Sequence, residues 1–327
     1  MQPVRALGRW ARRASLIAAV LGGAALAWSK VSPRPGVHLV NLLFSLTDTG
    51  EVKGMSASGV KGRMDLAYGS GPDELLDVWS PADATEPLPA VLWVHGGGWV
   101  GGGKSQPAPY LRLLAQHGYV AVGMDYSLAP GHRFPVPVRQ ASQALTWLQA
   151  HADELGIDPS RIVLAGDSAG AHVAAQVALV ATDPQYGELI GIAPVLDTDQ
   201  LRGVLLHCGP YDPPASMSAT GFGGWLVRTL GWAYLGTKDF TDPRVEQASI
   251  VEHATAAFPP ALLSWGDDDP LSAQGRALAD RLGELGVEHE AHCFPGLNHE
   301  FQFDLTRPEA RRVLDATVDF LARVTHR

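Results

Sequence analysis

Cysteine and basic residues are both scarce in this chain of 327 residues. Its two cysteines, Cys208 and Cys293, are too few for a small disulfide-stabilised scaffold. Each lies in an apolar run that we assign to a strand, and because the two strands are not neighbours we predict two buried free thiols. Lysine and arginine number 25 against 34 acidic residues, a formal charge of −9. This balance argues against a nucleic-acid-binding protein, which needs a basic surface.

Internal repeats and low-complexity tracts are also absent from the sequence. The lack of a repeat excludes a solenoid, and the lack of biased tracts excludes a long disordered region. A hydrophobic content of 46% with 18% charged residues is typical of a globular protein that buries a large core. The length fits one large α/β domain as well as two smaller domains.

The N-terminal segment lacks acidic residues, the first of which is Asp48. Arginines at positions 5, 9, 12 and 13 precede an uncharged run over 14–28 that contains a small-x-small cleavage site, Ala25-Leu26-Ala27. This layout is typical of an export signal. The run is shorter than the roughly 20 residues of a bilayer span, and an uncleaved signal-anchor is the alternative. We therefore expect residues 1–30 to be a signal peptide or signal-anchor. The protein would then be exported, either secreted or in the periplasm or cell envelope, or held at a membrane by this segment.

Residues 31–63 form an N-terminal segment with one helical pattern. Leu39, Leu42, Leu43 and Leu46 share a face there. Such a helix could form part of a cap over a site, lie on a membrane surface or pack on the body of the protein.

From residue 64 to 327 the chain alternates strands and helices. Strands are expected at 65–68, 75–79, 90–95, 119–125, 162–165, 204–207, 261–265 and 288–294. Most of the later runs are continuously apolar, as in parallel strands that are buried on both faces. We predict an α/β protein with a mostly parallel eight-stranded sheet and helices on both faces. The interval of about 211–259 has no strand signal but is rich in aromatic residues, which indicates a helical cap, with core packing as the alternative.

One stretch, Gly166-Asp167-Ser168-Ala169-Gly170, connects an apolar strand pattern to an Ala/Val-rich helix pattern. It matches G-x-S-x-G, the sharp turn that presents a nucleophilic serine, in which small neighbours let strand and helix approach closely. Such a serine needs a base and an acid to orient the base. His299, on the loop after the last strand, is the candidate base.

The acid is expected after the preceding strand, where Asp267, Asp268 and Asp269 are consecutive candidates. Asp269 is favoured because the following Pro270 restricts it to extended backbone, and the other two could be solvated surface residues. The order Ser…Asp…His is the one found in α/β-hydrolases.

Oxyanion donors are expected from the glycine-rich turn His95-Gly96-Gly97-Gly98-Trp99, together with the N–H group of Ala169. The overlapping stretch Gly98–Ser105 also matches G-x-x-x-x-G-K-S, the phosphate loop of nucleotide hydrolases. Pro107 and Pro109 argue against that alternative, because the Lys-Ser pair should already be entering a helix there.

Together these motifs resemble the hormone-sensitive-lipase-like branch of the α/β-hydrolases, which includes bacterial carboxylesterases and the arylacetamide deacetylases. The motifs are the glycine turn, the serine turn, Asp269-Pro270-Leu271, His299, and Tyr126-Ser127-Leu128-Ala129-Pro130 with Phe134-Pro135. The resemblance implies a catalytic triad of Ser168, Asp269 and His299. It implies an oxyanion hole from Gly97, Gly98 and Ala169, a structural His95, and no cofactor or metal. Glu300 departs from the family pattern, since glycine is common after the base.

The resemblance further implies hydrolysis of carboxylic esters with small-to-medium acyl or aryl groups. A feruloyl- or acetyl-esterase-like deacetylase and an acyltransferase are alternatives with the same triad, and an amidase or peptidase would share the machinery. A non-catalytic binding protein is the remaining alternative. Its expected sign is a missing triad member, and all three are present.

Overall fold

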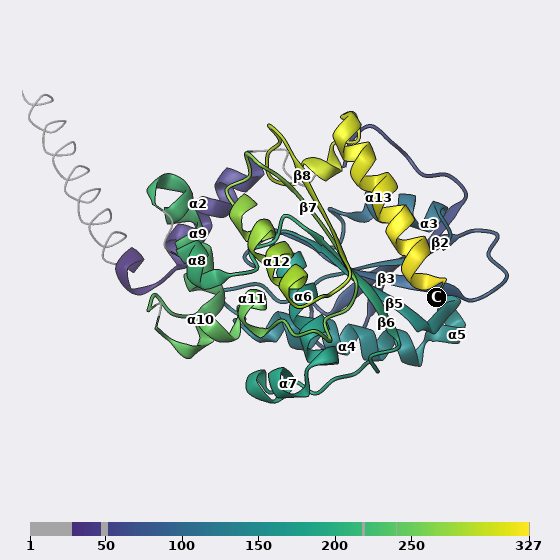
Figure 1. Cartoon of the computed structure of the whole chain (residues 1–327), viewed down its shortest axis with the longest axis horizontal. Coiled ribbons are helices and arrows are strands. Elements are labelled where there is room, and N and C mark those ends of the chain that lie inside the picture. Colours follow the sequence, from purple (N-terminus) through teal and green to yellow (C-terminus); the bar gives the residue numbers. More distant parts are fainter. Residues whose placement is uncertain (1–27, 47–51, 218–219, 240, 327) are drawn as a thin grey trace, which may run out of the picture.

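The computed structural model describes residues 28–46, 52–217, 220–239 and 241–326. Its centre is one sheet of eight strands in the order β1-β2-β4-β3-β5-β6-β7-β8 (Figure 1). The strands are Val60–Ala67 (β1), Leu75–Pro81 (β2), Leu88–Val94 (β3), Val120–Met124 (β4), Ile157–Asp167 (β5), Leu201–His207 (β6), Ala261–Gly266 (β7) and His289–Phe294 (β8). From β4 to β8 all neighbours are parallel, whereas β1 and β2 are antiparallel to their neighbours. The predicted fold class is therefore confirmed.

Helices cover both faces of this sheet (Figure 1). They are α2 (Arg34–Ser45), α3 (Ala108–Gln116), α4 (Val136–Ala150), α5 (Ala152–Leu155), α6 (Ala169–Thr182), α7 (Pro184–Ile190), α8 (Pro213–Met217), α9 (Gly221–Leu235), α10 (Pro243–Gln247), α11 (Ile250–His253), α12 (Ser272–Glu284) and α13 (Pro308–Thr325). A short 3-10 helix, Phe301–Phe303, follows the last strand.

Strand β3 shows why the apolar runs are continuous rather than alternating. Its Leu92 and Val94 pack in the core beneath α4, α6 and α12, whereas Val91 and Trp93 pack in the core beneath α3 and α13. Successive side chains of a strand point to opposite faces, so a strand that is covered on both sides must be apolar at every position.

The region predicted as a cap, about 211–259, holds α8 to α11, and α2 packs against α9. These helices gather at one end of the molecule (Figure 1). Only Val37 and Val40 of α2 are buried, whereas the leucines at 39, 42 and 46 are exposed. The leucine face expected from the sequence is thus not the face that packs on the protein. The domain boundaries themselves remain a prediction.

The prediction of two buried thiols is half wrong. Both cysteines are free, and Cys208 is buried, but Cys293 is exposed. Cys293 lies on β8, which is the edge strand of the sheet. An edge strand has a neighbour on one side only, so an apolar residue there can remain accessible to solvent.

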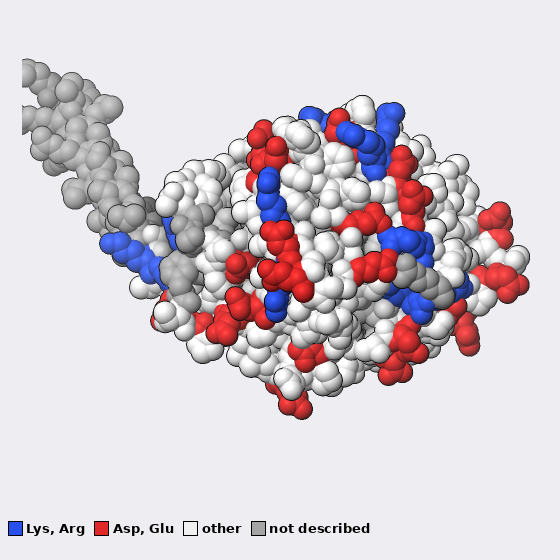
Figure 2. Space-filling view, in the orientation of Figure 1, with Lys and Arg blue, Asp and Glu red and all other residues white. Residues whose placement is uncertain are grey.

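Charges of both signs are interspersed on the face shown in Figure 2, with no continuous basic stripe there. Within the described residues, no helix combines the length and the apolarity that a bilayer crossing requires. The proposed leader lies outside the described residues, apart from its last three positions, 28–30.

Candidate active site

Ser168 lies at the tip of a strained turn between β5 and α6. Its backbone has φ +50° and ψ −123°, a conformation that residues other than glycine rarely adopt. A Cβ on Gly170 would lie 2.0 Å from the carbonyl oxygen of Val94, and one on Gly166 would lie 2.5 Å from the carbonyl carbon of Gly170. Both flanking glycines are therefore required for strand and helix to meet at this angle.

The residues that follow four neighbouring strands lie together at one edge of the sheet. Ser168 follows β5, Cys208 follows β6, Asp269 lies after β7 and His299 after β8. Because the strands are parallel and adjacent, their carboxyl ends meet, and residues 131 positions apart come into hydrogen-bond contact.

The three predicted triad residues form one chain of hydrogen bonds. His299 Nε2 lies 2.9 Å from Ser168 Oγ, and His299 Nδ1 lies 2.7 Å from Asp269 Oδ2. Oδ1 of Asp269 accepts a further bond from the backbone N–H of Leu271 at 2.7 Å. The Asp269 side chain is fully buried, whereas His299 is 29% exposed. The carboxylate is thus held rigidly behind the imidazole, which faces the cavity.

The other two acid candidates have different surroundings. Asp267 and Asp268 are exposed, and only Asp269 of the three is buried. Asp267 Oδ1 accepts a hydrogen bond from the backbone N–H of Gly296 at 2.5 Å, which ties down the loop that carries His299. Asp267 is therefore a support of that loop rather than a partner of the histidine.

The predicted oxyanion donors lie beside the serine. Gly97 and Gly98 have φ values of +98° and +61°, which glycine adopts without strain, and both line a cavity with Ser168. Ala169 is the first residue of α6 and lines a smaller pocket with Ser168 and Gly98. The N–H groups of these three residues have no hydrogen-bond acceptor in the described part of the chain. They are free to bind an oxyanion.

Asp167 couples the glycine turn to the serine turn, a role that we did not predict although the residue stands inside the serine motif. Its carboxylate accepts hydrogen bonds from Gly96 N–H at 2.9 Å and from the indole N–H of Trp93 at 2.7 Å. Burial and the neighbouring charge of Glu300 raise the pKa of Asp167 well above its usual range. Protonation of Asp167 is therefore easier than protonation of an ordinary aspartate.

His95 contacts the glycine turn through its imidazole ring. Its ring stacks on Tyr126 with 4.3 Å between ring centroids, and its Nδ1–H donates to the carbonyl of Gly96 at 2.7 Å. Burial lowers the pKa of His95 to about 4, so the ring is neutral at pH 7. These contacts fit the structural role that the resemblance implies.

Lys104 bears on the nucleotide-binding alternative. Its ammonium lies 2.8 Å from both Asp65 and Asp77, and its side chain is only 10% exposed. A phosphate-binding lysine must be free, and this one is neutralised. The following prolines do not prevent a helix, since α3 begins at Ala108 and Pro109 lies in its first turn. The objection to Pro109 was therefore wrong, because first-turn N–H groups need no partner. The main objection holds, since Lys104 and Ser105 lie in a turn before α3 and do not enter a helix.

Two cavities open beside Ser168. The larger, of about 710 Å³, is lined by the triad, by Leu43 and Phe44 of α2 and by Leu226 of α9. The smaller, of about 60 Å³, lies between Ala169, Tyr234 and Pro210 and is almost wholly apolar. Leu230 lines both cavities. The helices expected to cap the protein therefore form walls of its cavities.

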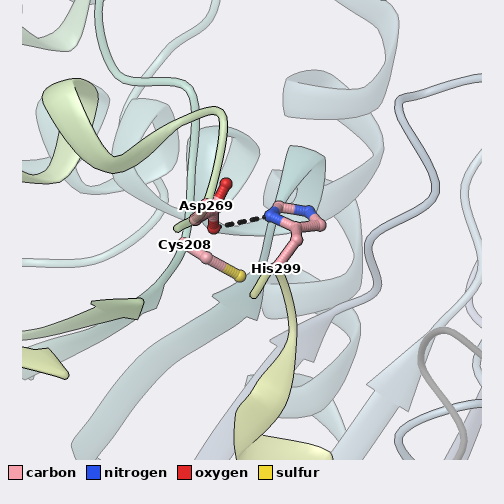
Figure 3. Close-up of side chains that lie close together, drawn as sticks. All are labelled: Cys208, Asp269 and His299. Atoms are coloured by element: carbon pink, nitrogen blue, oxygen red, sulfur yellow. Dashed lines mark hydrogen bonds and ion pairs between the residues drawn. The ribbon is translucent and has the colours of Figure 1, made fainter. Parts of the chain in front are cut away.

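Cys208 is the second residue near the triad that sequence reasoning did not find. Figure 3 shows its thiol beside Asp269 and His299, below the hydrogen bond that joins them. The available signal was its position at the end of the strand between those that carry the serine and the acid. That signal can be read only when the strand order is known.

Comparison with known proteins agrees with this geometry. A family model described as the alpha/beta hydrolase fold matches residues 91–303. Esterase LipC of Mycobacterium tuberculosis is 32% identical over 247 residues, which are 73% of this chain and 60% of that protein. Carboxylesterase NlhH of the same species is 29% identical over 78% of this chain and 81% of its own length. The chain thus spans about 60% of the length of the first of these relatives.

Solved structures show the same fold. Esterase B from Lactobacillus rhamnosis superposes with a TM-score of 0.75 at 22% identity, covering 93% of this chain and 96% of that one. A bacterial heroin esterase has a TM-score of 0.69 at 28% identity, covering 88% and 89% of the two chains. The shared fold extends well beyond the residues around the serine.

Proposed function

Because the chain belongs to the alpha/beta hydrolase fold family, in its hormone-sensitive-lipase-like branch, we propose that it hydrolyses carboxylic esters with small-to-medium acyl or aryl groups. The observation that carries this proposal is the unbroken hydrogen-bond chain from Ser168 through His299 to Asp269. The serine at the start of this chain lines the cavities together with Gly97, Gly98 and Ala169, whose N–H groups are free within the described residues.

The proposed reaction has two steps. His299 Nε2 accepts the proton of Ser168 as its Oγ attacks the ester carbonyl, and the N–H groups of Gly97, Gly98 and Ala169 stabilise the oxyanion. The protonated imidazole then donates to the departing alcohol, which leaves an acyl-enzyme. Water activated by His299 attacks this intermediate and releases the acid. The buried carboxylate of Asp269 keeps the Nδ1–H tautomer in place throughout.

The two cavities suggest how a substrate lies. We assign the acyl group to the small pocket, because its lining is almost wholly apolar and it lies against Ser168 and Ala169. We assign the alcohol to the larger cavity. A pocket of about 60 Å³ accommodates only a few carbon atoms, so short acyl chains should react faster than long ones.

A series of p-nitrophenyl esters from acetate to palmitate tests both the activity and this assignment. We expect kcat/KM to peak at two to four carbons. Leu230→Ala should move the peak to longer chains, because it enlarges the acyl pocket. Leu226→Ala is the matched control, since Leu226 lines only the larger cavity and should leave the acyl optimum in place. A peak at long chains in the unmodified protein would contradict the assignment.

The alternatives are separated by products and by substrate type. An acyltransferase would pass the acyl group to an added alcohol, so the ester of that alcohol would exceed the free acid among the products. A peptidase or amidase would cleave the matching anilide at a rate comparable with that of the ester. A deacetylase related to acetyl or feruloyl esterases would prefer acetylated or feruloylated sugars. A binding protein would show no turnover that depends on Ser168.

As the pH is lowered, the activity should begin to fall at a higher pH than it would with a histidine of ordinary pKa. Burial opposes protonation of His299, whereas the hydrogen bond to Asp269 and the charge of that carboxylate favour it, and the pKa of His299 lies well above its usual value. Only the neutral imidazole accepts the serine proton, so activity is lost as the pH falls through this pKa. We expect kcat/KM to rise tenfold per pH unit below an apparent pKa above about 6.5. A plateau that already begins at pH 6 would contradict this prediction.

We also propose that residues 1–30 direct export or anchor the chain at a membrane. The basic start and the uncharged run over 14–28 support this, as does the apolar surface beside it, where Trp28, Val31 and Leu42 are exposed. Cell fractionation combined with N-terminal sequencing of the mature protein tests the proposal. An unprocessed chain in the cytosolic fraction would contradict it.

A further inference from the structure

A thiol, a carboxylate and an imidazole meet at the base of the active site. Cys208 Sγ, a carboxylate oxygen of Asp269 and a ring nitrogen of His299 all lie within 4.8 Å of one another. The three side chains converge on one point in Figure 3. Cysteine, aspartate and histidine are the side chains that zinc takes as ligands in proteins.

The distances are close to those of a metal site. Zinc bonds of about 2.0–2.3 Å in tetrahedral geometry place the ligand atoms about 3.2–3.7 Å apart. To reach that spacing, the hydrogen-bonded atoms His299 Nδ1 and Asp269 Oδ2, which lie 2.7 Å apart, would separate by about 1 Å or less. The sulfur, within 4.8 Å of both, would move closer by about 1 Å. The sulfur ligand favours zinc and other thiophilic ions over magnesium and calcium, which prefer all-oxygen sites.

Gln302 provides an independent sign that a polar ligand fits here. Its side chain is 1% exposed, and its Nε2 lies 3.9 Å from Cys208 Sγ. Its Oε1 is buried without a hydrogen-bond partner among the described residues. Rotation of the amide by 180° about its Cγ–Cδ bond would turn Oε1 toward the cluster in place of Nε2. A bound cation would satisfy this oxygen.

An ion can reach the cluster from the substrate side. Asp269 and His299 both line the cavity of about 710 Å³. Cys208 lies behind them, buried. A cation would therefore enter along the path of the substrate and stop at the thiol.

We propose that Cys208, Asp269 and His299 form an inhibitory site for a thiophilic divalent cation such as Zn²⁺. On binding, the thiol loses its proton to solvent and forms the sulfur–metal bond. Nδ1 of His299 gives its lone pair to the metal, and the imidazole proton moves to Nε2. Nε2 then no longer accepts the proton of Ser168, so the base is blocked. The inhibition rests on the proposed function, whereas the metal binding does not.

Binding is measured first, on the full chain carrying Ser168→Ala, which keeps all three ligands. Equilibrium dialysis should show that this chain binds one zinc ion. Adding Cys208→Ser should weaken the affinity for zinc at least tenfold. Cobalt(II) should produce a thiolate-to-metal charge-transfer band that the same change removes. Cys293→Ser, at the exposed cysteine, is the matched control and should alter neither result. Cys208→Ala is the second variant if the serine variant does not fold.

Inhibition is measured next, with each variant normalised to its own rate without metal. Zinc should inhibit the unmodified enzyme reversibly, with activity restored by EDTA, and magnesium should not. Cys208→Ser should need at least tenfold more zinc. Equal zinc binding with and without Cys208, or loss of binding in the Cys293 variant instead, would overturn the proposal. If the protein hydrolyses no ester, dialysis and the cobalt spectrum still decide the metal site.

Discussion

Replacing Ser168 with alanine is expected to lower kcat at least about 10⁴-fold, because no acyl-enzyme can form without Oγ. The N–H groups of Gly97, Gly98 and Ala169 remain in this variant. Stabilisation of the oxyanion and binding of the substrate should therefore persist, and KM should change little. The residual rate would be that of water attacking a bound, polarised ester.

The variant should keep the fold, so its loss of activity is interpretable. Alanine at φ +50° bears the same backbone strain as serine, and Ser168 Oγ contributes one hydrogen bond, to His299. We expect the melting temperature to change by only a few degrees. An organophosphonate should label the unmodified enzyme once, at Ser168, and should not label the variant. Ser142→Ala, a buried serine of α4, is the control. Full activity in Ser168→Ala would refute the serine mechanism.

Replacing Asp269 with asparagine is expected to lower kcat about 10⁴-fold. The carboxylate accepts the Nδ1–H bond of His299 at 2.7 Å and thereby keeps Nε2 free to accept a proton. An asparagine amide can instead donate to Nδ1, which moves the imidazole proton to Nε2. The histidine would keep its place but lose its function as a base.

Asp268→Asn is the matched control for this prediction. The residue is adjacent and carries the same charge, but it is exposed, so its replacement should change kcat less than twofold. Asp267→Asn keeps a side-chain oxygen for the N–H of Gly296 and should have a small effect. Steady-state kinetics on one short ester is sufficient. Retention of more than a tenth of the activity by Asp269→Asn would assign the orienting role to another acid.

Local patterns in the sequence were enough for the fold class. Continuous apolar strands alternating with helices can form only a sheet covered on both faces, and the side chains of β3 pack into two cores as this requires. The glycines around Ser168 were equally informative. Gly166 leaves room for Gly170 within the turn, and Gly170 leaves room for Val94 of β3. The triad residues could be proposed because each follows a recognisable strand.

Exposure and contacts between distant segments were harder to predict. The thiol of Cys293 is exposed because β8 is the edge of the sheet, and nothing within the β8 sequence states which strand is outermost. Similarly, α2 packs on α9 and buries Val37 and Val40 in the core, whereas its Leu39 and Leu42 remain exposed. In both cases a partner from another part of the chain decides which side chains are covered.

The sequence by itself determined the strand-to-serine turn, the order of the candidate nucleophile, acid and base, and the glycine loop beside them, because these depend on backbone sterics and on short-range periodicity. The sequence favoured Asp269 among three consecutive aspartates, but only the tertiary structure decided that its carboxylate contacts His299. The tertiary structure also placed Asp167 against Gly96 and Cys208 beneath the acid–base pair. The physical reason is the strand order β5-β6-β7-β8, which brings four separate strand ends to one edge.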